Sequence, residues 1–209
     1  MVEVKVYSGG SVSTKEVDVS RFGERVLGRT LKDAVVMYEA NRRQGNAKAK
    51  SRGEVAGPNS KLWKQKKTGR ARMGSKKVSQ WRGGGAAFGP RPRDYFYQMP
   101  TKARRVALRN AIYSKFKDGE VALADGWPEG QPSTKQAVAV LSALGLDRSV
   151  LVVTEGLDQN LHLSLRNVPQ VDVAPLSDLN AHSVLLRRHM VLTPGALAQL
   201  EARMGAEGN

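Results

Sequence analysis

Val150-Leu151-Val152-Val153 is the clearest buried strand of this sequence, because all four residues are apolar and three are β-branched. A strand that is apolar on both faces is typical of a parallel sheet covered by helices on each side. Outward from it, further strands are expected around Val2, Val4 and Val6, around Val17 and Val19, and at 121–124, 171–173 and 191–192. Helical spacing predicts helices at 30–43, 102–117, 134–144, 159–166, 177–187 and 194–204. This alternation predicts an α/β fold, a mostly parallel sheet with helices on both faces, interrupted by a long basic extended internal loop.

Local signals predict some element ends and faces. Gly9-Gly10 is a turn signal, Thr134 is the expected N-cap of a helix that Gly145 ends, and Thr193-Pro194 is a cap followed by proline at the first helical position. In the helix at 102–117 the inward side chains are expected to be Val106, Ile112, Tyr113 and Phe116. The outward side chains are expected to be Lys102, Arg104, Arg105 and Arg109.

Residues 41–100, called the basic segment below, hold almost all of the net charge. They contain 16 Lys and Arg against two acids, Glu54 and Asp94, whereas the other 149 residues contain 18 basic and 17 acidic groups. Nine glycines and four prolines disfavour helix and strand there, and large apolar residues are too few for a core. We expect one globular domain from residues 1–44 and 101–209, and an internal loop at 45–100 that is extended or disordered when free. A loop of this charge needs a polyanion, and phosphate backbones are the usual one.

The densest cationic motif is Lys61-Leu-Trp-Lys-Gln-Lys-Lys-Thr-Gly-Arg-Ala-Arg72. Cations spaced along flexible backbone can follow irregularly placed phosphates, arginine binds phosphate bidentately, and Trp63 offers a stacking face. A solvated basic loop or a membrane-surface patch is the alternative. Membrane binding requires an amphipathic helix with an apolar stripe, and this stretch has Gly69, Gly74 and no such stripe. The motif favours nucleic acid.

A second motif runs from Trp81 to Tyr95, Trp-Arg-Gly-Gly-Gly-Ala-Ala-Phe-Gly-Pro-Arg-Pro-Arg-Asp-Tyr. Its glycines lack the spacing of a dinucleotide loop, and Pro90 and Pro92 preclude the helix that must follow one. We interpret it instead as bare backbone that approaches a partner closely, with Trp81, Phe88 and Tyr95 as anchors.

Other chemistry is weakly indicated. The sequence has no cysteine, and its three histidines, His162, His182 and His189, show no metal-ligand spacing. Acids near strand ends have the ordinary role of turn and cap residues; they are Asp125, Glu155, Asp158, Asp172 and Asp178. No apolar run approaches the roughly 20 residues of a membrane span. We expect no catalytic residue, no metal, no cofactor and no membrane partner.

The motifs resemble those of the bacterial ribosomal protein L4 family of the large subunit. The resemblance rests on 63–72, Gly74-Ser75, Trp81-Arg-Gly-Gly-Gly and 88–95, and extends to Arg42-Arg-Gln-Gly45, Arg104-Arg-Val-Ala-Leu-Arg109, Lys135 and 160–181. It covers nearly the full chain in order. Where the family usually has Pro and Gly, however, this chain has Leu62 and Lys67. After His189 it has Met190 where the family tends to have an acid.

The resemblance implies a non-enzymatic, cytoplasmic constituent of the large ribosomal subunit. Its α/β domain would lie on the solvent side, and its loop would thread ribosomal RNA to the wall of the peptide exit tunnel. The implied partners are large-subunit ribosomal RNA, neighbouring large-subunit proteins, and the nascent peptide at the loop tip.

The residues expected to bind RNA form four groups. The base of the loop contributes Arg42, Arg43, Lys48, Lys50 and Arg52. The motif at 61–72 contributes Lys61, Trp63, Lys64, Lys66, Lys67, Arg70 and Arg72, and the tunnel tip within it is Lys64, Gln65, Lys66, Lys67, Thr68, Gly69 and Arg70. The returning limb contributes Lys76, Lys77, Trp81, Arg82, Arg91 and Arg93. The helix at 102–117 contributes Arg104, Arg105 and Arg109, unless its basic face is merely solvated.

Two alternatives stay open at this point. A free-standing RNA chaperone or regulatory RNA-binding protein would have the same charge pattern. An α/β nucleotide enzyme with a basic substrate loop is a third reading, although the sequence has neither a phosphate loop nor a nucleophile–base pair.

Overall fold

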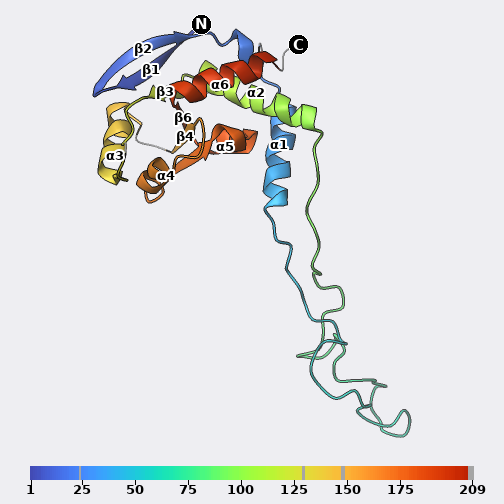
Figure 1. The fold of residues 1–209 in the computed structure, drawn as a ribbon. Coiled ribbons are helices and arrows are strands. Elements are labelled where there is room, and N and C mark those ends of the chain that lie inside the picture. The colour runs from blue at the N-terminus through green and yellow to red at the C-terminus, as the bar shows by residue number, and fades with distance from the viewer. Residues whose placement is uncertain (24, 129, 147–148, 207–209) are drawn as a thin grey trace. The chain divides into compact units, whose positions relative to one another are not determined.

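The computed structural model of the protein describes residues 1–23, 25–128, 130–146 and 149–206. Its strands are β1 (Val2–Ser8), β2 (Ser11–Val17), β3 (Val121–Ala124), β4 (Val150–Thr154), β5 (Val171–Pro175) and β6 (His189–Leu192). Its helices are α1 (Gly28–Asn41), α2 (Thr101–Lys117), α3 (Thr134–Ala143), α4 (Gln159–Leu165), α5 (Ala181–Leu186) and α6 (Pro194–Ala206), with short 3-10 turns η1 (Ser20–Phe22) and η2 (Leu176–Asp178). The predicted mixed α/β class is confirmed (Figure 1).

The strands form one six-stranded sheet in the order β2-β1-β3-β6-β4-β5. Only the pair β1–β2 is antiparallel, and the Gly9-Gly10 turn joins these two strands as predicted. The pairs β1–β3, β3–β6, β4–β6 and β4–β5 are parallel, so the sheet is mostly parallel. β4 is buried at every position, which confirms the reading of Val150–Val153.

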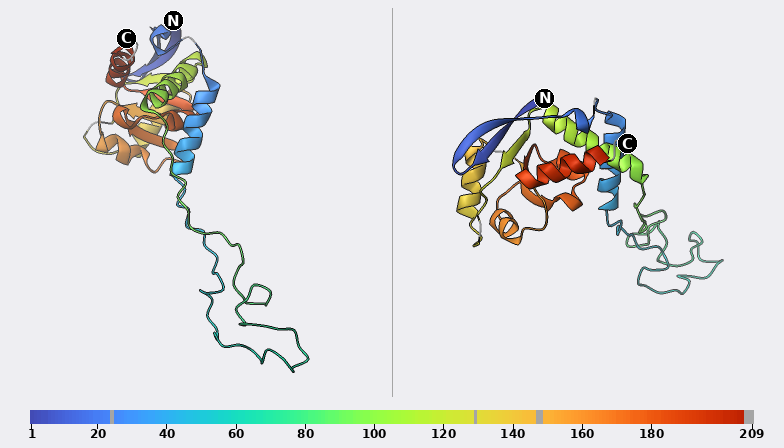
Figure 2. Two further views of the ribbon diagram at one scale, coloured as in Figure 1. Left: turned by 90° about the vertical axis from the view of Figure 1, so that its right-hand side faces the viewer. Right: turned by 45° about the horizontal axis from the view of Figure 1, so that its top comes forward.

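Alternate residues of the central strands point into two different apolar clusters. One cluster joins Leu123, Leu151 and Leu192 to α1, α2, α5 and α6, and includes the stacked rings of Phe22 and Phe116, whose centroids lie 5.0 Å apart. The other cluster joins Ala122, Val152 and Val191 to α3 and α4. The two groups of helices can be followed in Figure 1 and, from two other sides, in Figure 2.

The buried face of α2 differs from the prediction. Val106 is 40 % exposed, and Arg109 is partly buried rather than outward. The buried stripe runs through Ala107, Leu108, Ala111, Ile112 and Phe116. The prediction gave weight to large side chains, whereas two alanines occupy the positions where the helix packs closely on its neighbours. Lys102, Arg104 and Arg105 are exposed, as predicted.

Three element ends were also predicted wrongly. Ser133, not Thr134, is the N-cap of α3, because its hydroxyl accepts a hydrogen bond from the Gln136 amide. The helix expected at 177–187 is two elements, η2 and α5. Asn180 separates them: its side chain accepts a hydrogen bond from the Ser183 amide at 2.9 Å, and this starts a new helix. Val19 lies outside β2, next to η1, although it is buried as an inward residue would be.

Contacts divide the chain into two compact units, Met1–Glu39 with Gln98–Asn209, called the body below, and Ala40–Tyr97. The second unit covers most of the basic segment. Residues 42–100 form turns and bends, with no helix or strand anywhere in that range.

Candidate nucleic-acid interface

The basic segment consists of two limbs joined by hydrogen bonds between residues far apart in the sequence. The side-chain amide of Asn41 donates to the Tyr97 carbonyl at 3.2 Å and accepts from the Tyr97 amide at 3.1 Å. Backbone amides then donate across the limbs at three further levels, from Arg93 to Gly45, from Ala49 to Pro90 and from Ala86 to Lys50, over 2.9–3.1 Å. The limbs can be followed in Figure 2. Pro90 and Pro92 have no amide hydrogen, so a continuous ladder of hydrogen bonds cannot form between the two limbs.

Near its base the segment holds Tyr95 between two arginines. The guanidinium carbons of Arg43 and Arg93 lie 4.1 and 4.2 Å from the centre of the Tyr95 ring. A hydrogen bond from Arg93 and the positive charges of Arg43 and Arg93 lower the pKa of the Tyr95 hydroxyl. Gly45 lies against this stack, and a Cβ there would be 2.0 Å from the Arg93 carbonyl oxygen. Two cations predicted to bind RNA are therefore also packed within the segment.

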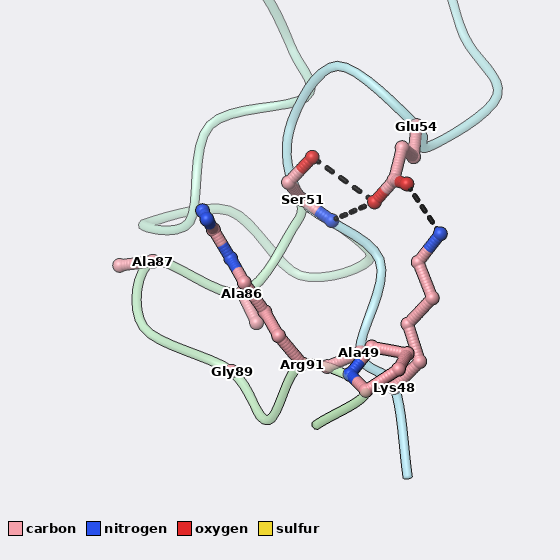
Figure 3. A pocket seen from close by; sticks show the side chains of 9 residues that line it. Lys48, Ala49, Ser51, Glu54, Ala86, Ala87, Gly89 and Arg91 are labelled. Atoms are coloured by element: carbon pink, nitrogen blue, oxygen red, sulfur yellow. Dashed lines mark hydrogen bonds and ion pairs between the residues drawn. The ribbon is translucent and has the colours of Figure 1, made fainter. Parts of the chain in front are cut away.

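Farther along the segment, Glu54 organises a tight turn (Figure 3). One carboxylate oxygen accepts hydrogen bonds from the amide and the hydroxyl of Ser51, at 3.0 and 3.1 Å, and the other lies 2.6 Å from the Lys48 ammonium. The hydrogen bond from Lys48, those from Ser51 and the charge of Lys48 lower the pKa of Glu54 to about 2. The turn borders a cavity of about 450 Å³ lined also by Ala86, Ala87, Gly89 and Arg91.

The glycines of the second motif approach the segment itself closely. Gly85 is buried, and a Cβ there would lie 2.3 Å from the Arg52 amide nitrogen of the opposite limb. A Cβ on Gly84 would lie 1.9 Å from the Val78 carbonyl oxygen. The bare backbone predicted to meet a partner therefore packs within the segment.

The region predicted as the tunnel tip closes through a few contacts. The Trp63 indole donates to the Ala71 carbonyl at 3.0 Å, and the Leu62 amide donates to the Gly74 carbonyl at 3.3 Å. The Arg70 guanidinium lies 5.8 Å from the Trp63 ring centre, and Lys61 hydrogen-bonds to Gln65. Lys67 has φ of +63°, the left-handed conformation that favours glycine. This is one of the two positions where the sequence departs from the expected motif.

Most of the predicted RNA-binding side chains are exposed. In the basic segment the exposed ones are Arg42, Arg43, Lys48, Lys50, Arg52, Lys61, Lys64, Lys66, Lys67, Arg70, Arg72, Lys76, Trp81, Arg82, Arg91 and Arg93, while Trp63 and Lys77 are partly buried. The structure brings Lys48 and Arg91 to the same cavity and Arg43 and Arg93 to the same ring. Phe88 was predicted as a partner anchor but not among the RNA-binding residues, and its side chain is fully exposed at 104 % of the reference area. An aromatic residue among cations was the available signal.

The body carries a separate basic hollow at the start of α2. Arg104, Arg105 and Arg203 line a cavity of about 250 Å³ together with Tyr38 and Asn180, and Leu108 and Leu179 are buried beneath. Arg104 donates to the Thr101 hydroxyl at 3.3 Å, and Arg203 to the Leu176 carbonyl at 3.4 Å. Arg203 was not predicted, because it lies almost a hundred residues from Arg105 in the sequence. Partly buried Arg109 is not among the lining residues.

Four of the acids near strand ends form hydrogen bonds or ion pairs within the chain, namely Asp125, Asp158, Asp172 and Asp178. Asp158 accepts from the Leu161 amide as the cap of α4, and Asp172 pairs with Arg187 at 2.6 Å. Within the described ranges, no three His, Cys, Asp or Glu side chains gather in a way that could hold a metal ion. In the same ranges no helix is long and apolar enough to cross a membrane. The arrangement presents positive charge on a hydrogen-bonded scaffold.

Comparisons with known proteins show the family of this chain. The profile of the ribosomal protein L4/L1 family matches residues 15–203. The large ribosomal subunit protein uL4 of Symbiobacterium thermophilum is 42 % identical over 207 residues, which cover 98 % of this chain and 100 % of that protein. The proteins of the same name from Thermoanaerobacter sp. and Brevibacillus brevis are 41 % and 39 % identical over 203 residues, 96 % of this chain and 98 % of theirs. By full-length similarity, this chain belongs to the ribosomal protein L4/L1 family, whose members are structural proteins and not enzymes.

Proposed function

We propose that this chain is a structural constituent of the large ribosomal subunit that binds large-subunit ribosomal RNA through the basic segment. The observation that carries the proposal is the net charge of +14 on residues 41–100, displayed on exposed side chains. Family membership supplies the subunit, since the relatives are named as large-subunit proteins.

The internal contacts of the segment leave its charge almost uncompensated. Of its two acids, Glu54 neutralises only Lys48, and the Asp94 carboxylate accepts the Phe96 amide at 2.8 Å. Sixteen cations on a scaffold without helix or strand repel one another, and phosphates relieve that repulsion. The cross-limb hydrogen bonds set which residues of the two limbs lie opposite one another.

The proposed roles follow the position along the segment. Residues 45–100 are the RNA-binding loop, and residues 1–44 and 101–209 form the domain that docks on folded RNA beside neighbouring large-subunit proteins. A limb of about 30 residues spans at most roughly 100 Å when fully extended, at about 3.3 Å per residue. That length supports the second part of the proposal, that residues 64–70 reach the wall of the peptide exit tunnel and contact the nascent peptide.

Salt dependence tests the electrostatic mechanism. If about half of the segment's cations contact phosphates, log affinity against log salt should fall with a slope of about −6 to −7 for the purified protein and its ribosomal RNA. Lys15→Gln in β2, a matched loss of one exposed charge outside the segment, should leave the slope unchanged, whereas Lys76→Gln should reduce it by about 0.7–0.9. A slope near zero for the unchanged protein would exclude the mechanism.

Sedimentation separates the proposal from the alternative of a free-standing RNA chaperone. A core constituent stays with large subunits through a high-salt gradient, whereas a chaperone or regulatory RNA-binding protein is released.

Photo-crosslinks from residue 66 in translating ribosomes should reach tunnel RNA or the nascent peptide. Crosslinks to solvent-side RNA only would contradict the placement of the tip.

A further inference from the structure

Three aromatic residues of the second motif were predicted as partner anchors, and the structure separates their roles. Tyr95 is held between Arg43 and Arg93 inside the segment. Trp81 is 40 % exposed, so much of its ring is already covered. Phe88 is 104 % exposed and therefore packs against nothing in its own chain. Of the three, Phe88 alone keeps its whole ring available to a partner.

The backbone on both sides of Phe88 is fixed to the opposite limb. Two residues before it, the Ala86 amide donates to the Lys50 carbonyl at 2.9 Å, and two residues after it, the Pro90 carbonyl accepts from the Ala49 amide at 3.0 Å. Gly89 packs so closely that a Cβ there would lie 2.5 Å from that of Ala49. The ring is thus displayed from a short strap, residues 86–90, pinned at both ends. A pinned backbone lowers the ordering entropy that a contact of this ring would otherwise cost.

The surroundings of the strap indicate what kind of partner the ring meets. The strap is hydrogen-bonded to Ala49 and Lys50 of the opposite limb. Lys48, Lys50 and Arg52 lie in that limb, and Arg91 directly follows the strap in the sequence. An exposed ring among cations is how proteins bind single-stranded RNA, because cations hold the backbone while the ring stacks on a base. A basic protein surface would be repelled by the charges of Lys50, Arg52 and Arg91.

We propose that Phe88 is a base-stacking residue, which holds an unpaired RNA nucleobase while the flanking cations hold its phosphates. This inference rests on the proposed RNA-binding function and deepens it by naming a contact that involves no charge. The fully exposed ring makes no internal contact, so its substitution does not disturb the fold.

Substitutions at Phe88 separate stacking from electrostatics. With an in vitro transcript of large-subunit ribosomal RNA, Phe88→Ala in the full-length protein should lower affinity about 5- to 150-fold, the range for loss of one aromatic–base stack. The salt slope should stay unchanged, because no charge is removed. Phe88→Tyr should bind like the unchanged protein, and Phe88→Leu should lose most of the affinity that Phe88→Ala loses.

Two control variants make the comparison sharp. Arg91→Gln should weaken binding and also reduce the salt slope by about 0.7–0.9, whereas Phe88→Ala should leave the slope unchanged. Leu157→Ala in the body, which removes another highly exposed apolar side chain, should change neither the affinity nor the salt slope. A photo-reactive phenylalanine analogue at position 88 should crosslink to a nucleotide in assembled large subunits.

The outcomes separate failure of the stacking role of Phe88 from failure of the proposed RNA-binding function. If the unchanged protein shows no salt-dependent affinity for the RNA, the proposed function itself fails. If it binds with a steep slope while Phe88→Ala binds equally well, only the stacking role is overturned. A crosslink from position 88 to a neighbouring protein, or equal affinity of Phe88→Leu and the unchanged protein, also overturns it.

Discussion

At the scale of single residues, Lys115 is a buried lysine of the body. Its side chain is 9 % exposed, and its ammonium donates to the Glu120 carboxylate at 2.6 Å and to the Arg188 carbonyl at 2.7 Å. Arg188 also lies 3.6 Å from the other Glu120 oxygen. These contacts tie α2 to the residues that precede β3 and β6. The sequence showed Lys115 only as one more cation of a basic helix.

Lys115→Met keeps the length of the side chain but leaves the Arg188 carbonyl and one Glu120 oxygen without their partner. We expect the free energy of unfolding to fall by about 1–3 kcal/mol, the cost of unsatisfied buried polar groups. Chemical denaturation measures it. Lys102→Met in the exposed first turn of the same helix is the control and should change stability by less than about 0.5 kcal/mol. Equal effects of the two variants would show that the buried contacts contribute nothing.

Glu54 predicts a pH dependence confined to its turn. Its pKa is lowered from 4.5 to about 2 by the hydrogen bonds from Lys48 and Ser51 and by the charge of Lys48. A depressed pKa means that the stabilisation is complete above pH 4.5 and is lost as the pH falls toward 2. We expect the Glu54 carboxyl resonance to titrate well below 4.5 in low salt and closer to 4.5 in high salt. Glu54→Gln should remove the acid-dependent change of the Ser51 amide resonance, and a normal titration of Glu54 would contradict the turn.

At the scale of elements, the helices and strands of the body were largely predictable, because their hydrophobic periodicity reflects burial directly. β3 and β4 are apolar runs buried on both faces, and α4 and α6 begin within a residue of the expected positions. The errors have a common cause. Ser133 and Asn180 end or start helices through side-chain hydrogen bonds, and Ala107 and Ala111 are buried because helices pack closely there. Neither effect changes the periodicity of the sequence.

The pairing of the two limbs was not predictable, since it depends on single hydrogen bonds between residues up to 56 positions apart. Gly45 tests it. Gly45→Ala places a Cβ against the Arg93 carbonyl at a φ of +63°, so the limbs must separate there and the Arg43–Tyr95–Arg93 stack must open. Because that stack lowers the pKa of Tyr95, we expect the pKa to rise toward its ordinary value.

The pKa of Tyr95 can be followed by NMR of the tyrosine ring carbons in the intact protein. Gly53→Ala is the matched control, because a Cβ on Gly53 meets nothing within 4 Å. It should leave the Tyr95 titration unchanged. An unchanged titration in Gly45→Ala as well would mean that the limbs tolerate separation at this level, or that the stack does not depend on their pairing.

At the scale of the whole molecule, the charge map was readable from the sequence alone, because a run of cations needs no knowledge of the fold. The sequence could not show which cations are also used internally. Lys48 pairs with Glu54, and Arg43 and Arg93 stack on Tyr95, although all three read as free phosphate ligands. It also could not show that Arg203 lies beside Arg104 and Arg105, since α2 and α6, which line that hollow, are far apart in the sequence.

The two apolar clusters of the body contain no buried residue from the range 53–93. Deleting Gly53–Arg93 should therefore leave cooperative thermal unfolding of the body intact, because the deletion removes charge and turns but no core. Eleven cations leave with it, so affinity for large-subunit ribosomal RNA should fall steeply at low salt and the salt slope should become much shallower. Calorimetry and filter binding on the same preparation measure both effects. A broad, non-cooperative transition in the deletion variant would show that the basic segment contributes to the fold of the body, and an unchanged slope would place the RNA contacts outside it.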